Sequence, residues 1–246
     1  MKALVFAAGR GERMRPLTDT LPKPLLPAGP QRLIEWHLHK LAALGIGEVV
    51  VNIAWLAPRF PELLGDGSRY GLRLHYSHEG DQALETGGGM LQALPLLGGE
   101  PFLVVNGDVW TDFDFARLPR EPAGLAHLLM VDPPTQAPAG DFRLGDDGLL
   151  HEIDAPAAAL LPALTYAGIG VYRPALLDGW RGVIGHAPGA REQPPRFPLA
   201  PLLRAAIRDG AVTGEHHRGA WTDVGTPDRL ATLEHTLLRS RKTPPF

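Results

Sequence analysis

Cysteine is absent from this chain of 246 residues, so disulfide bonds, thiolate metal ligands and a cysteine nucleophile are excluded. An excess of positive charge is also lacking. The 24 Lys and Arg residues are outnumbered by 27 Asp and Glu residues, and the net charge of −3 argues against a nucleic-acid partner. With 44% hydrophobic and 21% charged residues, the chain has the composition of a globular protein.

Long apolar runs are missing as well. Residues 1–8 carry one lysine and a short hydrophobic stretch, which stops at residues 9–13, too early for a signal-peptide core or a membrane span. A buried first strand explains this segment better. We therefore expect a cytoplasmic protein without a membrane partner, and a monomer, because no obvious assembly extension is visible.

Strands alternate with helices along the first half of the chain. Short apolar runs typical of buried parallel strands occupy residues 2–8, 48–54, 72–77 and 101–106. Apolar residues at helical spacing predict helices over residues 32–44 and 86–97. This alternation predicts an α/β fold: a single Rossmann-like, doubly wound, mixed but mostly parallel sheet with helices on both faces.

The second half is less regular. Further strands are expected at residues 124–131, 141–144, 148–153, 164–172 and 221–224, and helices at residues 199–208 and from Thr226-Pro227-Asp228 onward. No internal repeat is visible, and no linker separates two cores. We expect one domain over residues 1–246.

Residues 7–16 form a Gly- and Arg-rich segment directly after the first strand. Its paired glycines let the backbone bend tightly and bring N–H groups against phosphate oxygens, and its three arginines suit a polyphosphate. The pattern is weak alone. Met14 stands where the dinucleotide fingerprint needs a third glycine, and no Lys-Ser or Lys-Thr pair completes a P-loop.

Lys23 stands between Pro22 and Pro24, which make this segment stiff and extended. Two interpretations stay open. Lys23 is either an ordinary solvated loop lysine or a cation held at a fixed point with little entropy to lose, and the spacing does not decide between them.

Two aspartates follow predicted strands. Asp108 comes after the run at residues 101–106, and ligands of open parallel sheets bind outside the carboxyl ends of the strands, where an acid can hold Mg²⁺. An aspartate that only shapes the turn is the alternative. Asp223, near the end of the strand expected at residues 221–224, lies at a comparable place, but the spacing does not show that the two acids meet.

Together these segments resemble the sugar nucleotidyltransferase (nucleoside-diphosphate-sugar pyrophosphorylase) family. The resemblance is carried, in order, by residues 7–18, 22–25, 106–108, 167–169 and 221–226. It implies the fold of a nucleotide-diphospho-sugar transferase. It also implies an enzyme that joins a nucleoside triphosphate to a sugar 1-phosphate and releases pyrophosphate.

The resemblance assigns roles by position. Arg13 and Lys23 would be the catalytic cations, and Asp108 and Asp223 the Mg²⁺ ligands. The nucleotide-binding positions would be Gly11, Glu12, Arg13, Lys23, Tyr76, Glu79 and Gly87. The sugar-phosphate-binding positions would be Asn106, Asp141, Glu152 and Gly168. The resemblance also divides the chain into a nucleotide-binding half, residues 1–115, and a sugar-phosphate-binding half, residues 116–246, although Asn106 lies in the first half.

Two of these positions depart from the family pattern. Many relatives have glutamine near position 79, whereas Glu79 can accept hydrogen bonds but cannot donate them while ionised. Relatives usually show Glu-Lys-Pro near position 152, and the lysine is missing after Glu152.

Within the family, four segments are most similar to bacterial uridylyltransferases that act on N-acetylmuramate α-1-phosphate in cell-wall (peptidoglycan) recycling: residues 64–69, 84–89, 105–112 and 140–144. This similarity implies UTP as the nucleotide. Transferases of glucose 1-phosphate or mannose 1-phosphate, with UTP, dTTP or GTP, remain alternatives. A non-catalytic nucleotide-sugar sensor is the alternative of another class, and it gives no reason to keep Lys23, Asp108 and Asp223.

Overall fold

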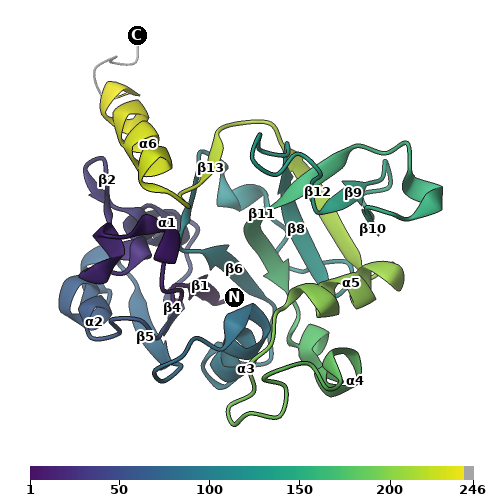
Figure 1. Ribbon diagram of the computed structural model, residues 1–246, viewed down its shortest axis with the longest axis horizontal. Helices are drawn as coiled ribbons and strands as arrows, with labels where there is room; N and C mark the ends of the chain where they lie inside the picture. The colour runs from purple at the N-terminus through teal and green to yellow at the C-terminus, as the bar shows by residue number, and fades with distance from the viewer. Residues whose placement is uncertain (241–246) are drawn as a thin grey trace.

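The computed structural model describes residues 1–240, except the side chains of Ala157 and Ser240. Within these residues a nine-stranded sheet has the order β10-β9-β11-β6-β1-β4-β5, with β8 paired to β11 and β12 paired to β8 (Figure 1). Its strands are β1 (Ala3–Phe6), β4 (Glu48–Ile53), β5 (Arg73–His78), β6 (Phe102–Asn106), β8 (Ala126–Val131), β9 (Phe142–Leu144), β10 (Leu150–Glu152), β11 (Ala163–Tyr172) and β12 (Val212–His217).

Strand β1 lies inside the sheet, parallel to β4 on one side and to β6 on the other, and β4 is parallel to β5. These are the four strands that the apolar runs of the first half predict. Strand β11 then pairs antiparallel to β6 and β8, which makes the sheet mixed. The parallel strands end together at one edge, and the predicted α/β fold class is confirmed.

Helices cover both faces of the sheet. They are α1 (Leu33–Ala43), α2 (Arg59–Leu64), α3 (Glu85–Leu97), α4 (Trp180–Ile184), α5 (Ala200–Arg208) and α6 (Pro227–Ser240). Side chains of β1 alternate between two cores: Val5 belongs to the cluster that includes Leu38 of α1, and Leu4 to the cluster that includes Met90 of α3. Because of this alternation, β1 is buried on both faces of the sheet.

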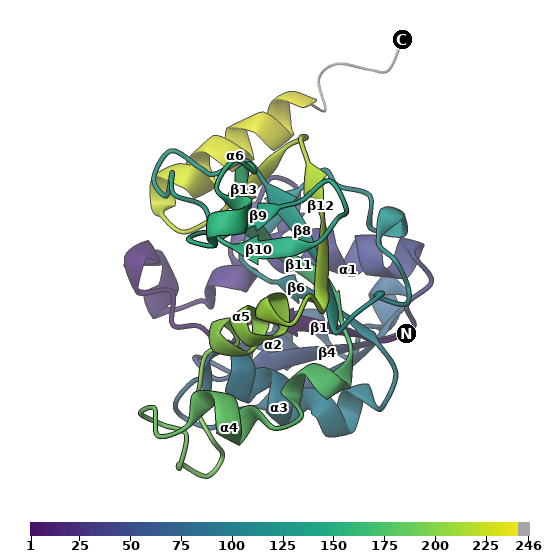
Figure 2. The same cartoon turned by 90° about the vertical axis from the view of Figure 1, so that its right-hand side faces the viewer.

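A third hydrophobic cluster joins the two ends of the described chain. Met14 and Leu26, from the N-terminal segments, are buried against Val224 and against Leu230 and Leu237 of α6. Helix α6 lies beside β13 (Trp221–Asp223) in both views (Figure 1 and Figure 2). This cluster therefore holds Asp223, at the end of β13, close to the loop that precedes Met14.

Two short paired elements complete the frame around the edge of the sheet. Strand β7 (Val109–Thr111) pairs antiparallel with β13, and β2 (Pro27–Ala28) pairs with β3 (Gln31–Arg32). The sequence does not predict β7 or α2, because three and six residues are too few for a periodicity to show. Over residues 1–240, no helix combines the length and hydrophobicity that crossing a bilayer requires.

Candidate active site

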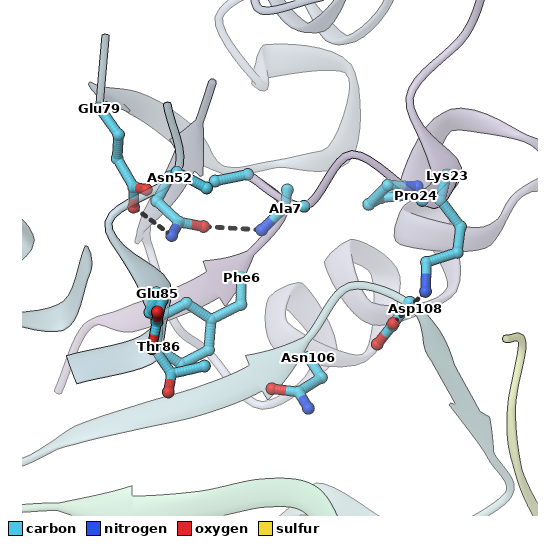
Figure 3. A pocket seen from close by; sticks show the side chains of 14 residues that line it. Phe6, Ala7, Lys23, Pro24, Asn52, Glu79, Glu85, Thr86, Asn106 and Asp108 are labelled. Carbon is cyan, nitrogen blue, oxygen red and sulfur yellow. Dashed lines mark hydrogen bonds and ion pairs between the residues drawn. The ribbon is translucent and has the colours of Figure 1, made fainter. Parts of the chain in front are cut away.

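A cleft of about 240 Å³ opens at the carboxyl ends of β1, β4 and β6 (Figure 3). It is lined by Phe6, Ala7, Ala8, Gly9, Gly11, Lys23, Pro24, Asn52, Glu79, Ala83, Glu85, Thr86, Asn106 and Asp108. In Figure 3, Lys23 and Asp108 lie on one side of the cleft, and Asn52 and Glu79 lie on the other. The cleft is where ligands of open α/β sheets bind.

The N-terminal loop bends sharply at Gly11, whose φ is 64°. A Cβ there would lie 2.9 Å from Cγ2 of Thr18 and 3.3 Å from Cβ of Lys23. The Thr18 hydroxyl donates a 2.8 Å hydrogen bond to the Gly11 carbonyl. Glycine at this position thus lets the lysine segment pack directly against the loop, and the exposed Glu12 follows it at the start of a 3₁₀ helix.

Replacing Gly11 with alanine should therefore destabilise the protein more than the same change at Gly45. Both glycines have left-handed φ values, 64° and 79°, which cost a non-glycine residue roughly 1–2 kcal/mol. A Cβ on Gly45 meets nothing within 4 Å, so only Gly11→Ala adds a clash. Urea unfolding measures both costs, and equal free energies of unfolding for the two variants would contradict the close packing.

Lys23 and Asp108 form an ion pair between Nζ and Oδ2. The lysine side chain is only 13% exposed and the aspartate side chain 35%. Lys23 is therefore a fixed cation rather than a solvated loop lysine. Pro22 caps a 3₁₀ helix over Lys23–Leu25 that contains Pro24, so the extended segment that the sequence predicts is a helical turn at Lys23.

Asp223 reaches the same region from the far end of the chain. In the β7–β13 pairing it lies opposite Val109, and the Val224 N–H donates a 2.8 Å hydrogen bond to the Asp108 carbonyl. The backbones of the two aspartates are thus side by side. The Asp223 carboxylate is ion-paired through Oδ1 with Arg229 of α6, and Gln136 donates to the same oxygen at 3.3 Å.

Arg13 and Asp223 both approach Gly225. The position that a Cβ on Gly225 would occupy is 3.2 Å from Oδ2 of Asp223 and 3.3 Å from Nη2 of Arg13. Nη2 of Arg229 lies 3.1 Å from the same point. Arg13, Asp223 and Arg229 thus gather beside the Asp108 segment, although none of the three is among the residues that line the cleft.

The two aspartates have the donor chemistry of a magnesium site. The hydrogen bonds and ion pairs of the described residues engage Oδ2 of Asp108 and Oδ1 of Asp223, so the other oxygen of each carboxylate remains a candidate ligand. Residues 1–240 contain no group of three or more acids and histidines able to hold a metal. A two-carboxylate site suits Mg²⁺, which usually fills its remaining positions with water and substrate phosphates.

The other side of the cleft is built around a buried carboxylate, Glu79. It accepts a 2.6 Å hydrogen bond from Nδ2 of Asn52 and a 2.7 Å hydrogen bond from the Leu84 N–H. Burial raises the pKa of the Glu79 carboxyl, although these two hydrogen bonds act in the opposite direction. Oδ1 of Asn52 accepts a 2.6 Å hydrogen bond from the Ala7 N–H.

Four of the predicted nucleotide-binding residues are not among those that line the cleft: Glu12, Arg13, Tyr76 and Gly87. The Tyr76 hydroxyl donates to the Gly65 carbonyl at 2.6 Å, and burial raises its pKa to about 12. The Gly87 N–H donates to the Phe197 carbonyl at 3.0 Å, and a Cβ on Gly87 would lie 2.5 Å from the Phe197 ring. Their observed contacts are structural.

The predicted sugar-phosphate residues divide in the same way. Asn106 ends β6 in the cleft, and Gly168 faces it so closely that a Cβ would lie 2.5 Å from Nδ2 of Asn106. Asp141 instead accepts a 2.9 Å hydrogen bond from the Tyr166 N–H. Glu152 is ion-paired with Arg208 of α5 at 3.1 Å. Neither carboxylate lines the cleft.

Comparison with known protein families identifies the family of the chain. The profile of the nucleotidyl transferase family matches residues 2–140. The chain belongs to this family.

Similar nucleotidyl transferases cover almost the whole chain. N-acetylmuramate alpha-1-phosphate uridylyltransferase of Neisseria meningitidis serogroup B is 47% identical over 94% of this chain and 95% of its own. The protein of the same name from Caulobacter vibrioides is 34% identical over 96% of both chains. A crystal structure from Bacillus anthracis, provisionally named a glucose-1-phosphate thymidylyltransferase, has a TM-score of 0.79 at 20% identity over 97% and 95% of the two chains. The last similarity concerns the fold.

Two site residues of this nucleotidyl transferase are missing from the sequence predictions. Asn52 is a polar residue near the end of the apolar run at residues 48–54, and this interruption is a signal in the sequence. Arg229 offers no such signal, because an arginine in a helix of mixed polarity is ordinary. Its pairing with Asp223 is visible only in the structure.

Proposed function

We propose that this nucleotidyl transferase joins UTP to N-acetylmuramate α-1-phosphate, giving UDP-N-acetylmuramate and pyrophosphate in peptidoglycan recycling. The observation that carries the proposal is the ion pair of Lys23 with Asp108 in the cleft, with the Asp223 segment hydrogen-bonded beside it. The two relatives named for this reaction are 47% and 34% identical over nearly the whole chain, which supports the choice of substrates.

The proposed reaction is an in-line attack by a phosphate oxygen of the sugar 1-phosphate on the α-phosphorus of UTP. The bond from the α-phosphorus to the bridging oxygen breaks, and pyrophosphate leaves with the electron pair. A phosphate monoester is already anionic near neutral pH, so no strong general base is required. The obstacles are the repulsion between two anions and the charge that gathers on the leaving group, which Arg13 and Lys23 offset by position and charge.

Mg²⁺ is the proposed cofactor, with Asp108 and Asp223 as its protein ligands. When bound, it would neutralise phosphate charge and stabilise the departing pyrophosphate. Lys23 and Arg229 each hold one oxygen of these carboxylates, so they orient the acids as well as adding positive charge.

The assignment of the two substrates to two halves of the chain also belongs to this proposal. Residues 1–115 would bind the nucleotide, and residues 116–246 the sugar phosphate, within one domain. Asp141 and Glu152 keep their predicted role only if substrate changes the contacts described above. The monomeric state and the cytoplasmic location stay predictions.

A matrix of substrates tests the proposal. Pyrophosphate release is measured for UTP, dTTP, GTP and CTP, each with N-acetylmuramate, N-acetylglucosamine, glucose and mannose 1-phosphates. We expect kcat/KM for UTP with N-acetylmuramate 1-phosphate to exceed every other pair by at least about tenfold, the effect of one well-placed hydrogen bond. Preference for another pair would overturn the proposed substrates but not the proposed type of reaction. No release with any pair would favour the nucleotide-sugar sensor.

A further inference from the structure

A chain of three buried hydrogen bonds runs through the wall of the cleft. It leads from the Ala7 N–H to Oδ1 of Asn52, from Nδ2 of Asn52 to Oε1 of Glu79, and from the Leu84 N–H to Oε2 of Glu79. Asn52 is 2% exposed and Glu79 is 4% exposed. The chain therefore ties the loop after β1 to the ends of β4 and β5 and to the start of α3. Figure 3 shows the two of these bonds that Asn52 makes.

Backbone groups fix the direction of every bond in this chain. The Ala7 N–H can only donate, so the oxygen of the Asn52 amide must face it, and the Asn52 nitrogen must face Glu79. The Leu84 N–H also can only donate. Position 79 must consequently accept at both of its terminal atoms. A carboxylate does so, whereas a glutamine has one acceptor and one donor.

The pair has little room to rearrange. Gly89 of α3 lies so close that a Cβ there would overlap Oε1 of Glu79 and would lie 2.8 Å from Nδ2 of Asn52. Both side chains are thus held between α3 and the loop after β1. The Ala7 N–H is bonded to Asn52, so the position of that loop depends on these hydrogen bonds. Ala7 and the two residues that follow it line the cleft, so the same bonds shape the cleft wall.

We propose that Asn52 and Glu79 are a positioning pair, which sets the Ala7–Gly9 loop in the place required to bind the nucleoside triphosphate. This inference rests on the proposed function, since it concerns the same cleft. It also gives the reason for glutamate at position 79: the carboxylate is there to accept from Asn52 and Leu84. The pair acts on the nucleotide through the loop backbone.

An exchange of the two functional groups tests the pair. In Asn52→Asp, two carboxylates face each other. In Glu79→Gln, the new NH₂ group faces the Asn52 nitrogen or the Leu84 N–H. The double variant restores every bond: Ala7 N–H and Gln Nε2 both donate to the new aspartate, and Leu84 N–H donates to the Gln oxygen. The net charge and the side-chain sizes stay nearly constant between wild type and the double variant.

Two measurements follow the exchange. Calorimetry of UTP with Mg²⁺, without sugar phosphate, gives Kd, and hydrogen exchange gives the protection of the Ala7 amide. We expect each single variant to bind UTP at least about tenfold more weakly and to exchange faster at Ala7, because a buried hydrogen bond is lost. The double variant should come within about threefold of wild type, since all three bonds are restored.

Controls separate the alternatives. Glu48→Gln removes the same charge from an exposed pair with Lys2 at the other end of β4, and it should leave UTP binding unchanged. Circular dichroism and thermal unfolding report folding. A double variant as weak as Glu79→Gln would overturn the inference, because the carboxylate at position 79 would then contact the nucleotide directly. Single variants with wild-type Kd would overturn it as well. Absence of UTP binding in the wild type would instead overturn the proposed function.

Discussion

Lys23→Ala is expected to lower turnover about 100- to 1000-fold, the usual cost of removing one preorganised charge contact at a reacting phosphate. Lys23 is fixed by its flanking prolines and by its ion pair with Asp108, so its charge needs no reorganisation as the reaction proceeds. The removal also leaves the Asp108 carboxylate without its cation. The measurement is pyrophosphate release at saturating substrates, with kcat and KM determined separately.

A second lysine serves as the control for this prediction. Lys2 also makes an ion pair and a backbone contact, with Glu48 at 3.3 Å and the Leu96 carbonyl at 2.9 Å, but it lies at the other end of β1. Lys2→Ala should keep wild-type turnover. Unchanged turnover in Lys23→Ala would remove that residue from the site. An equal loss in both variants would point to a general effect of the lost charge on the fold.

Asp108→Asn is expected to lower turnover by a similar factor, about 100- to 1000-fold, and to weaken Mg²⁺ binding. Asparagine keeps the size of the side chain but removes the negative charge that a hard cation requires. Chelation of Mg²⁺ should abolish pyrophosphate release in the wild type, and added Mg²⁺ should restore it. Calorimetry of Mg²⁺ with UTP present measures the affinity independently of turnover.

The matched control is Asp132→Asn. Asp132 is an exposed acid that pairs with His216 at 2.9 Å, outside the residues that line the cleft. It should affect neither turnover nor Mg²⁺ affinity. Wild-type Mg²⁺ affinity in Asp108→Asn would exclude Asp108 as a ligand, whatever its effect on the rate.

The positions of Asp108 and Asn106 could be predicted, because a polar turn after an apolar run places its residues at the carboxyl edge of a parallel sheet. The contact of Asp108 with Lys23 could not. The two residues belong to different segments, and a local pattern carries no information on which segments meet. The proline pair leaves a solvated and a fixed Lys23 equally open, and the ion pair in the structure decides for the fixed cation.

The residues of the opposite wall show a different limit. Tyr76 and Glu79 are three positions apart in the same segment, yet only Glu79 lines the cleft. Side chains of an extended segment alternate between its faces, so residues three positions apart point to opposite sides, and the sequence does not show which side faces the cleft. Gly87 shows another limit. It packs against Phe197, which is distant in the sequence, and no local spacing implies that contact.

The cluster that buries Met14 and Leu26 against Leu230 and Leu237 has a consequence for the order of events in the cell. Contacts between segments so far apart close late, since the chain must first give up the entropy of a very large loop. A growing polypeptide that already contains the loop of residues 7–16 and Lys23 still lacks α6, which packs the segment with Asp223 and Arg229 against them. Under the proposed function, a chain that has not yet formed this helix is therefore expected to be inactive.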